Sequence, residues 1–444
     1  MHPRRVTTPI LCVVFLACAF TLHAQDQKFF SDGADEDKRV TFGFEAKVHY
    51  RDTDDVSFPV PFPPGDGPRF TLDSVDPGSH FELSVLTLFL DATIAPSVTA
   101  HAKVDVVDLY DRNPTSSDRE VDVDEAWIRF GNEVEPGELP ARGGGMYLKV
   151  GKMGKFERQD DRHLESYGLV STAFNRMEDF GVEVGWDITR NVYLKATATQ
   201  GNPVFLRNTT ALAGDNGTPA VEAGRDPELA TGFPILYDAE VEDLDTDGEL
   251  EYGIGLGFRF GDANRAIDVL FWAYERELAD TVDLEGTFYG GDLDLLLGPG
   301  NIFPFAVEGR DKRELGVNVW VYWDDLTLFA QAVDAELAGL DRFAWEVEAS
   351  YAFDLPLVWA VGGQQLFSWI APAARYSKLE PDYGFPQFTP SPSFAWEWEK
   401  IDLGLRLGVL DGVDFTAEYA LDRFLRAGIW EERNEYLTTL RWRL

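Results

Sequence analysis

The feature that most constrains the fold is a two-residue alternation of apolar and polar side chains, repeated in segments of about ten residues. In residues 40–50, Val40, Phe42 and Phe44 alternate with polar or small residues. This period is typical of β-strands with one apolar face. After residue 24 no apolar run is long enough for a spanning helix. Candidate strands lie near residues 40–50, 81–94, 98–108, 121–131, 145–152, 179–188, 191–200, 250–260, 266–275, 313–323, 326–334, 343–353, 357–376, 397–408, 413–422 and 434–444.

The connections between these segments alternate between short and long. Short ones carry turn residues such as Asp, Asn, Gly and Pro, at 95–97, 189–190, 261–264, 324–325, 354–356 and 411–412. Long ones cover 51–80, 109–120, 153–178, 201–249, 276–312, 335–342, 377–396 and 423–433. A soluble sandwich has no reason for this asymmetry. The sequence therefore predicts an all-β transmembrane antiparallel β-barrel of about sixteen strands, with long extracellular loops and short periplasmic turns.

A closed sheet can cross a membrane because it pairs every backbone amide and leaves no edge. One face of each strand then meets lipid and the other meets the lumen, which water enters when the barrel is this wide. Aromatic residues near strand ends suit the two interfacial belts, and we expect Trp127, Tyr147, Tyr193 and Trp323 among them.

The first residues predict export. Arg4 and Arg5 precede a short apolar stretch that ends in a small residue, Ala24, so residues 1–24 are interpreted as a cleaved signal peptide. A lipoprotein signal at Cys18 fits less well, because large residues precede that cysteine. Both cysteines of the chain, Cys12 and Cys18, lie in this segment. We expect an acidic N-terminal segment at 25–39 and the barrel over 40–444.

Two stretches carry a resemblance to a known family. The end of the chain, Tyr436-Leu-Thr-Thr-Leu-Arg-Trp-Arg-Leu444, resembles the terminal strand that the outer-membrane assembly machinery recognises in bacterial porins, except that the family usually ends in Phe. Residues 148–155 with 124–129 resemble the strand pair before the third loop of phosphate-selective porins of the O and P type. The resemblance implies a homotrimeric porin of the cell outer membrane, in contact with the lipid bilayer and lipopolysaccharide, through which small solutes diffuse passively.

In such porins the third loop often folds inward and narrows the channel. The corresponding segment here, residues 153–178, carries basic and acidic groups that would face each other across a constriction and select ions. The alternative is a solvated outer loop with no contact to the pore. The candidate constriction residues are Lys155, Glu157, Arg158, Asp160, Asp161, Arg162, His163 and Arg176.

Charge gives a first indication of selectivity. The chain has 77 acidic and 39 basic residues, a formal net charge of −38, which argues against a nucleic-acid partner. The acidic loops predict a weak cation preference, because a negative vestibule concentrates cations. Phosphate-selective relatives need a ladder of Lys and Arg, and the sequence shows none. The candidate lumen-lining residues are Glu45, Lys47, Lys149, Glu183, Glu346, Glu348, Arg406 and Glu418.

No sequence motif indicates a catalytic group or a resident cofactor, so we expect a channel and not an enzyme. Asp243, Asp245 and Asp247 copy the first half of a calcium loop, but Ile254 stands where the bidentate Glu is needed. A surface calcium and a simple turn both remain open there. Two other functions also remain open: an occluded outer-membrane barrel that acts as an adhesin, anchor or enzyme, and a soluble secreted β-protein.

Overall fold

The computed structural model describes the barrel strands and most of their shorter connections. The fold described below rests on residues 40–54, 57–59, 71–73, 78–108, 122–159, 162–174, 178–201, 250–262, 264–277, 311–337, 339–382, 396–426 and 428–444. The expected signal peptide, residues 1–24, and the acidic segment 25–39 lie outside these residues and stay predictions.

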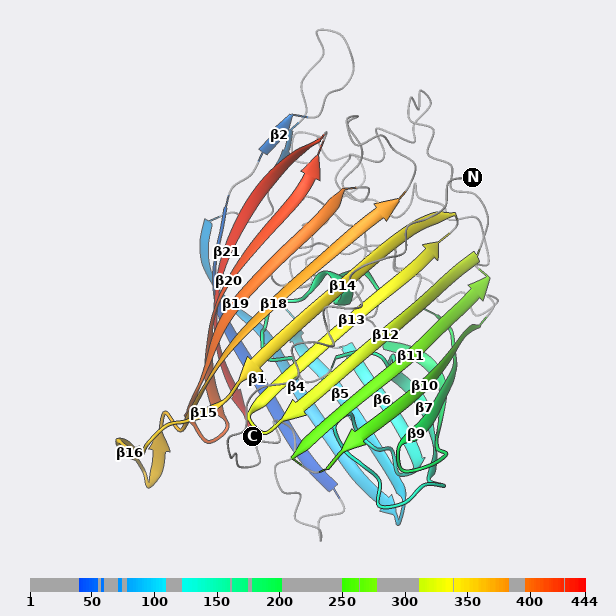
Figure 1. Ribbon diagram of the computed structural model, residues 1–444. Coiled ribbons are helices and arrows are strands. Elements are labelled where there is room, and N and C mark those ends of the chain that lie inside the picture. The colour runs from blue at the N-terminus through cyan, green and yellow to red at the C-terminus, as the bar shows by residue number, and fades with distance from the viewer. Residues whose placement is uncertain are drawn as a thin grey trace.

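Sixteen antiparallel strands form one closed barrel (Figure 1). Each strand pairs with its neighbour in sequence, and the first strand also pairs with the last. At the closure Phe44 and Leu444 exchange two backbone hydrogen bonds of 2.9 and 3.1 Å. The barrel strands are β1 (Val40–Thr53), β4 (Gly78–Ala95), β5 (Val98–Asp108), β6 (Asp122–Gly131), β7 (Met146–Gly154), β8 (Glu178–Asp187), β9 (Val192–Thr199), β10 (Glu251–Gly261), β11 (Arg265–Glu277), β12 (Asp311–Trp323), β13 (Leu326–Leu337), β14 (Leu340–Tyr351), β18 (Trp369–Asp382), β19 (Glu397–Leu410), β20 (Val413–Arg426) and β21 (Ile429–Arg443).

The remaining described elements are short. Two-residue β15 (Phe353–Asp354) continues β14 along β18, and two small hairpins pair β2 (Ser57–Pro59) with β3 (Thr71–Asp73) and β16 (Trp359–Val361) with β17 (Gln364–Leu366). The described helix α2 (Leu169–Ala173) has five residues. Within the described part of the chain, no helix has the length and apolarity to cross a membrane.

The two faces of the barrel differ as the alternation predicts. On β10, Tyr252 and Ile254 point outward and are 61% and 59% exposed, whereas Glu251 and Arg259 point inward and are buried. An outward apolar band suits hydrocarbon, and a charged interior suits a polar lumen. The alternation along the described strands therefore gives the sheet an apolar outer face and a charged inner face.

Glycines on the inner face of β10 make room for side chains from neighbouring segments. A Cβ on Gly257 would overlap the ring of Tyr193, and a Cβ on Gly255 would lie 3.0 Å from the ring of Phe156. The glycine positions inside this strand thus correspond to close approach of other groups, which is one of the meanings that a strand glycine can have.

The strand predictions hold along most of the chain, with errors at three connections and one strand. Residues 335–342 and 423–433 are not long loops, because β13 pairs with β14 up to Leu337 and Leu340, and β20 pairs with β21 up to Arg426 and Ile429. Residues 354–356 are not a tight turn, and residues 357–376 are not one strand. The chain instead forms the β16–β17 hairpin there and enters β18 only at Trp369.

Three of the residues expected in the aromatic belts lie inside the barrel. Tyr147 and Tyr193 are buried and donate hydrogen bonds to the inward carboxylates of Glu183 and Asp268. Trp127 stacks on His101, with ring centroids 5.2 Å apart. The belt prediction is wrong for these three because it used nearness to a strand end and ignored which face the residue occupies.

Candidate functional site: the barrel lumen

The connection between β7 and β8 folds into the barrel. Its described residues, 155–159 and 162–174, are here named the inner loop, and they contact the inner faces of β10–β14, β18–β21 and β1. Along its first residues the loop keeps an alternation: Lys155, Glu157 and Gln159 are buried, while Phe156 and Arg158 are partly exposed. Phe156 also packs on the wall, with its ring 5.3 Å from that of Tyr274, whereas Arg158 reaches Glu125 of β6 and Glu178 of β8.

Lys155 is the first anchor of the inner loop. Its Nζ lies 3.0 Å from Glu251 and 3.2 Å from Glu314, and 4.3 Å from the ring centroid of Tyr274. Burial would lower the pKa of Lys155, but the two carboxylates outweigh burial and raise the pKa well above its usual value. The ammonium therefore stays charged and ties the start of the loop to β10 and β12.

Glu157 is held by neutral donors. One carboxylate oxygen accepts a hydrogen bond of 2.7 Å from the hydroxyl of Tyr274, and its backbone oxygen accepts one of 2.5 Å from the side-chain amide of Asn318. Burial raises the pKa of Glu157 to about 7, although nearby Lys155 acts against the rise. This carboxyl group can therefore change its charge near neutral pH.

Inward carboxylates of the wall accept hydrogen bonds from the backbone of the inner loop. Glu348 accepts from the amide of His163 at 2.9 Å, and Glu418 accepts from the amide of Ser166 at 3.0 Å. Glu346 accepts from the amide of Val170 at 3.2 Å. Charge-assisted bonds to backbone amides are strong and orient the segment that donates them. These three acidic residues, predicted to line the lumen, therefore hold the loop in place.

Basic side chains of the wall complete the attachment by donating to loop carbonyls. Arg375 donates to the carbonyl of Ser166 at 2.8 Å and also pairs with Glu348 and Asp402. Lys400 donates to the carbonyl of Tyr167 at 2.8 Å. Donors and acceptors of the loop backbone are thus both satisfied by charged side chains of β14, β18, β19 and β20.

Glu165 ties the far side of the loop to the strands that close the barrel. Its carboxylate lies 2.9 Å from Nζ of Lys47 on β1 and 3.5 Å from Nη1 of Arg441 on β21. Burial works in the opposite direction, but Lys47 and Arg406 hold the pKa of Glu165 at about 2. The pair is therefore ionised over the physiological range.

Helix α2 packs its apolar residues against the wall. Leu169, Val170 and Ala173 are buried, and the guanidinium of Arg342 lies 4.4 Å from the ring centroid of Phe174. At its start, Gly168 leaves no space for a side chain, because a Cβ there would overlap the carboxylate of Glu346. The glycine allows the helix N-terminus to approach that carboxylate closely.

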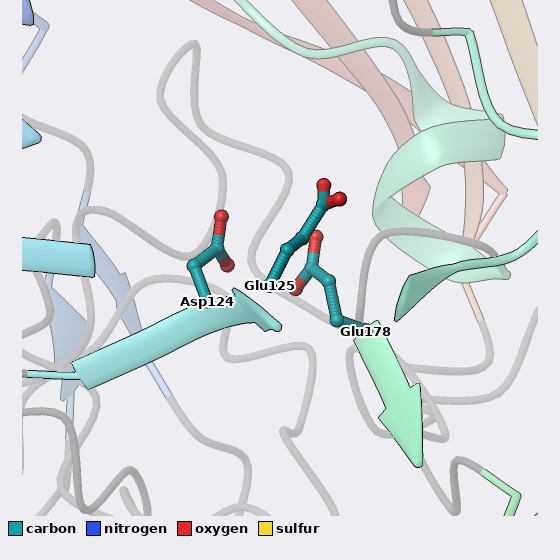
Figure 2. A group of neighbouring side chains, drawn as sticks. All are labelled: Asp124, Glu125 and Glu178. Atoms are coloured by element: carbon teal, nitrogen blue, oxygen red, sulfur yellow. The ribbon is translucent and has the colours of Figure 1, made fainter. Parts of the chain in front are cut away.

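Three carboxylates meet near the start of the inner loop, on the other side of the lumen. Asp124 and Glu125 of β6 and Glu178 of β8 point toward one another (Figure 2), with ligand oxygens within 4.8 Å. Lys103 pairs with Asp124, and Arg158 pairs with both Glu125 and Glu178. Because two cations already match much of this negative charge, the group is an ion-pair network that joins the loop to β5, β6 and β8.

A second segment also enters the lumen, from the opposite end of the barrel. In the β6–β7 connection (132–145), Glu133 lies 2.9 Å from Lys149, 2.8 Å from Lys195 and 3.1 Å from Arg129. These cations lower its pKa well below the usual value, although burial alone would raise it. Arg259 donates to the carbonyl of the next residue, Val134, at 3.0 Å. Sequence reasoning missed Glu133, whose one signal was a connection too long for a turn.

The structure describes five of the eight predicted constriction residues. Of the constriction candidates, Lys155, Glu157 and His163 face the wall and are buried, whereas Arg158 and Arg162 are partly exposed. The guanidinium of Arg162 lies over the ring of Tyr167 at 3.7 Å. All eight lumen candidates point inward; seven contact the loop, Glu133 or one another, and Arg406 contacts Asp414. Asp160, Asp161, Arg176, Asp243, Asp245 and Asp247 lie outside the described residues.

Most of the lumen candidates pair with neighbours of opposite charge. Glu45 lies 3.7 Å from Lys47 and also pairs with Arg443. Lys149 lies 3.7 Å from Glu183. Arg406 donates to Asp414 at 3.0 Å. The described lumen is therefore lined by matched charges and not by a ladder of one sign.

The fold resembles that of two solved bacterial proteins. The structure of the outer membrane channel DcaP of Acinetobacter baumannii matches with a TM-score of 0.53 and 9% sequence identity, over 91% of this chain and 97% of that one. A high-pH structure of OprB of Pseudomonas putida matches with a TM-score of 0.51 and 11% identity, over 92% and 95%. No family model and no curated protein matches the sequence. Identities this low show the fold alone, that of an outer-membrane barrel.

Proposed function

We propose that this protein is a passive diffusion channel of the cell outer membrane, with no enzymatic activity, in which small solutes pass beside the inner loop. The observation that carries the proposal is an asymmetry of the lumen. The inner faces of β10–β14 and β18–β20, here named the clamped wall, are covered by the loop. The inner faces of β4–β7, here named the open wall, are touched by the described part of the inner loop through the pair of Arg158 with Glu125. The segment 132–145 contacts this wall through Glu133, which pairs with Arg129 and Lys149.

Solvent exposure differs between the two walls in the same sense. On the clamped wall, the side chains of Arg375 and Glu348 are each 1% exposed. On the open wall, Lys103 is 29% and Arg129 is 19% exposed. Charged side chains that keep contact with water inside a barrel are what an aqueous path needs. We therefore place the path between the inner loop and the open wall, where Arg158 and Arg162 would form one side of a constriction.

For selectivity we propose a weak cation preference. The described lumen does not strongly favour either cations or anions, because Lys103, Arg129 and Lys149 each lie beside a carboxylate. The acidic surplus of the chain lies in its loops, for example in residues 201–248. A loop field of this kind acts over about a Debye length, roughly 10 Å at 0.1 M salt, so the preference should fall as salt rises.

Single-channel recording tests the proposal. The purified chain, shown by anomalous migration on an unboiled detergent gel to hold a closed barrel, is added to a planar bilayer. We expect discrete conductance steps and, in a salt gradient, a reversal potential of the sign given by cation flow. A clear chloride preference would contradict the cation preference alone, and a folded barrel that never conducts would contradict the channel.

A second candidate function is an occluded barrel that acts as an adhesin, anchor or enzyme. The observation in its favour is that two separate segments, the inner loop and residues 132–145, both lie in the lumen and are held by many charged contacts. The same recording separates the two candidates, because an occluded barrel gives no steps while its gel migration stays anomalous.

The placement in the membrane implies further partners that we propose with it. A cleaved signal at 1–24 would export the chain, and the apolar end at Leu444 would be recognised by the assembly machinery. The outer surface would contact phospholipid and lipopolysaccharide, and a homotrimer is proposed from the resemblance to porins. Cross-linking of the protein in native membranes, followed by unboiled gels, tests the trimer, and a single band at the monomer position would contradict it.

A further inference from the structure

The connection between β14 and β18 differs from the other described connections at the same end of the barrel. It runs from 352 to 368 and contains the hairpin of β16 and β17, whereas the neighbouring connections are the two-residue turns 324–325 and 411–412. Those turns carry Asp, but residues 355–368 contain no charged side chain at all. In a chain with 26% charged residues, a long uncharged connection needs an environment other than open water.

The first strand of the hairpin, β16, and the residues that lead into it are apolar on both faces. Leu357, Trp359 and Val361 alternate with Val358 and Ala360, and the four larger of these side chains are 58–68% exposed. A surface that docks onto one protein partner is apolar on one side, with a polar reverse side. Apolar side chains on both faces are expected where an apolar medium surrounds the hairpin.

The position of the β16–β17 hairpin indicates that this medium is lipid. Figure 1 shows β16 projecting sideways beyond the outline of the barrel, near the level of the C-terminus. Phe353, in the segment that leads to the hairpin, is itself outward-facing and 49% exposed, so the apolar surface continues from the barrel wall. The backbone conformation produces the bends of this segment. Gly362 and Gly363 both have positive φ, as a tight hairpin turn requires, and Phe367 has a φ of 56°.

We propose that this hairpin lies in the interfacial layer of the phospholipid leaflet at the short-turn end of the barrel and anchors the barrel there. The inference rests on the proposed membrane placement and goes beyond it. A hairpin of three residue pairs is marginal in water and leaves unpaired backbone groups along its edges. In the hydrocarbon core those groups would be costly, but at the interface water and headgroups can bind them. Trp359 and the amides of Gln364 and Gln365 suit the same depth.

Lipid-borne quenchers test the depth. In a full chain with Cys12→Ser and Cys18→Ser, single cysteines at Val361, Leu403 and Asp411 are labelled with an environment-sensitive fluorophore and placed in phosphatidylcholine vesicles. Leu403 is an outward residue of β19, 53% exposed, and Asp411 is an exposed turn residue at the same end as the hairpin. The three positions therefore report the barrel wall, the hairpin and the water-facing turns.

We expect the Val361 label to be quenched most by quenchers near the headgroup, at least about threefold more than the Asp411 label, and the Leu403 label to be quenched most by deeper ones. A quenched Leu403 with a Val361 label as unquenched as Asp411 would overturn the hairpin proposal alone. An unquenched Leu403 would overturn the membrane placement on which it rests. Energy transfer between Val361 labels on different copies, without lipid quenching, would show instead that a second chain covers the hairpin.

A pair of variants gives an independent readout. Trp359→Asp with Val361→Asp should lower the temperature at which the barrel unfolds in vesicles, because two charges would enter the interfacial layer. The same change should have little effect in detergent micelles, which adapt to the protein surface. The matched control, Gln364→Asp with Gln365→Asp, changes already polar positions and should have a smaller effect in vesicles. Equal effects of both pairs in vesicles would contradict the anchor.

Discussion

The clamped wall and the open wall of the lumen use the same residue types for different purposes. On the clamped wall, Glu348, Arg375 and Asp402 are almost fully buried. They form ion pairs with each other, and Glu348 and Arg375 also form hydrogen bonds with the loop backbone. On the open wall, Lys103 and Arg129 keep contact with solvent. A charged inward residue is therefore not a selectivity residue by its type. What separates structural from permeation roles in this account is whether the inner loop covers the residue.

The largest expected effect is the loss of a charge from the clamped wall. Arg375→Ala would leave Glu348 and Asp402 buried without their guanidinium and remove the bond to Ser166. Breaking a buried ion pair costs about 3–5 kcal/mol, so we expect lower stability by that order or failure to fold. Urea unfolding followed by gel migration measures the change.

The matched control for Arg375 is Arg313→Ala. Arg313 is also a strand arginine paired with acidic residues, but its side chain is 54% exposed. We expect a change of about 0.5 kcal/mol or less, because exposed pairs contribute little. Similar losses for the two variants would remove the distinction between the covered and the exposed charges.

The next effect is on the loop itself. Glu418→Ala removes the acceptor of two backbone amides, those of Glu165 and Ser166, at 2.5 and 3.0 Å. With this hold lost, the loop should leave the clamped wall part of the time. We expect noisier single-channel currents and a change in mean conductance of roughly twofold or less. Currents identical to those of the unchanged protein would show that this contact does not position the loop.

A smaller effect is expected when a charge is removed from the open wall. Lys103→Ala leaves Asp124 without its cation in the proposed path, so the reversal potential in a salt gradient should shift toward stronger cation preference. The fold should tolerate the change better than it tolerates Arg375→Ala, because Lys103 is the more exposed. Arg313→Ala, which removes the same charge outside the lumen, should leave the reversal potential unchanged.

The smallest effect is a dependence on pH. Because burial raises the pKa of Glu157 from 4.5 to about 7, lowering the pH from 8 to 6 should protonate it and weaken the cation preference. A raised native pKa means that protonation favours the folded state, so this group's contribution to stability is present below pH 4.5 and lost as pH rises through 7. In Glu157→Gln the step near neutral pH should become smaller, and a step of unchanged size would assign it to other groups.

At acidic pH a second group should act in the opposite sense. The pKa of Glu165 is lowered to about 2, so its pairing with Lys47 stabilises the barrel above pH 4.5 and is lost as pH falls toward 2. Unfolding of Glu165→Gln should accordingly be less sensitive to pH in that window than unfolding of the unchanged protein.

Most of the barrel could be predicted because lipid imposes one rule on every strand within the membrane. The predicted segment 98–108 coincides with β5, for example. The rule fails where strands rise beyond the hydrocarbon, since both faces then meet polar surroundings. Charged residues such as Arg342 and Arg433 therefore made two strand ends resemble loops, although both side chains are buried inside the barrel. The prediction of one strand over residues 357–376 was wrong because hydropathy alone does not distinguish a strand of the barrel wall from an apolar hairpin.

For the lumen, the sequence could predict which residue types face inward but not which groups they contact. The two-residue alternation placed Glu346, Glu348 and Glu418 on the inner face. It could not show that these carboxylates accept hydrogen bonds from the backbone of a segment 176–253 residues away in the sequence. Glu133 was missed because two of its partners, Lys149 and Lys195, come from β7 and β9 and meet it only when the β6–β7 connection folds into the lumen. Such contacts depend on where loops settle, and no local pattern records that.

The central claim, that solutes pass along the open wall, is tested most directly by thiol modification during recording. Single cysteines replace Lys103 on the open wall and Ser377 on the clamped wall, which is fully buried, in the background with Cys12→Ser and Cys18→Ser. Addition of a negatively charged methanethiosulfonate should change the current through the Lys103→Cys channel within the recording and leave that of Ser377→Cys unchanged. A current that responds at position 377 and not at 103 would contradict the account.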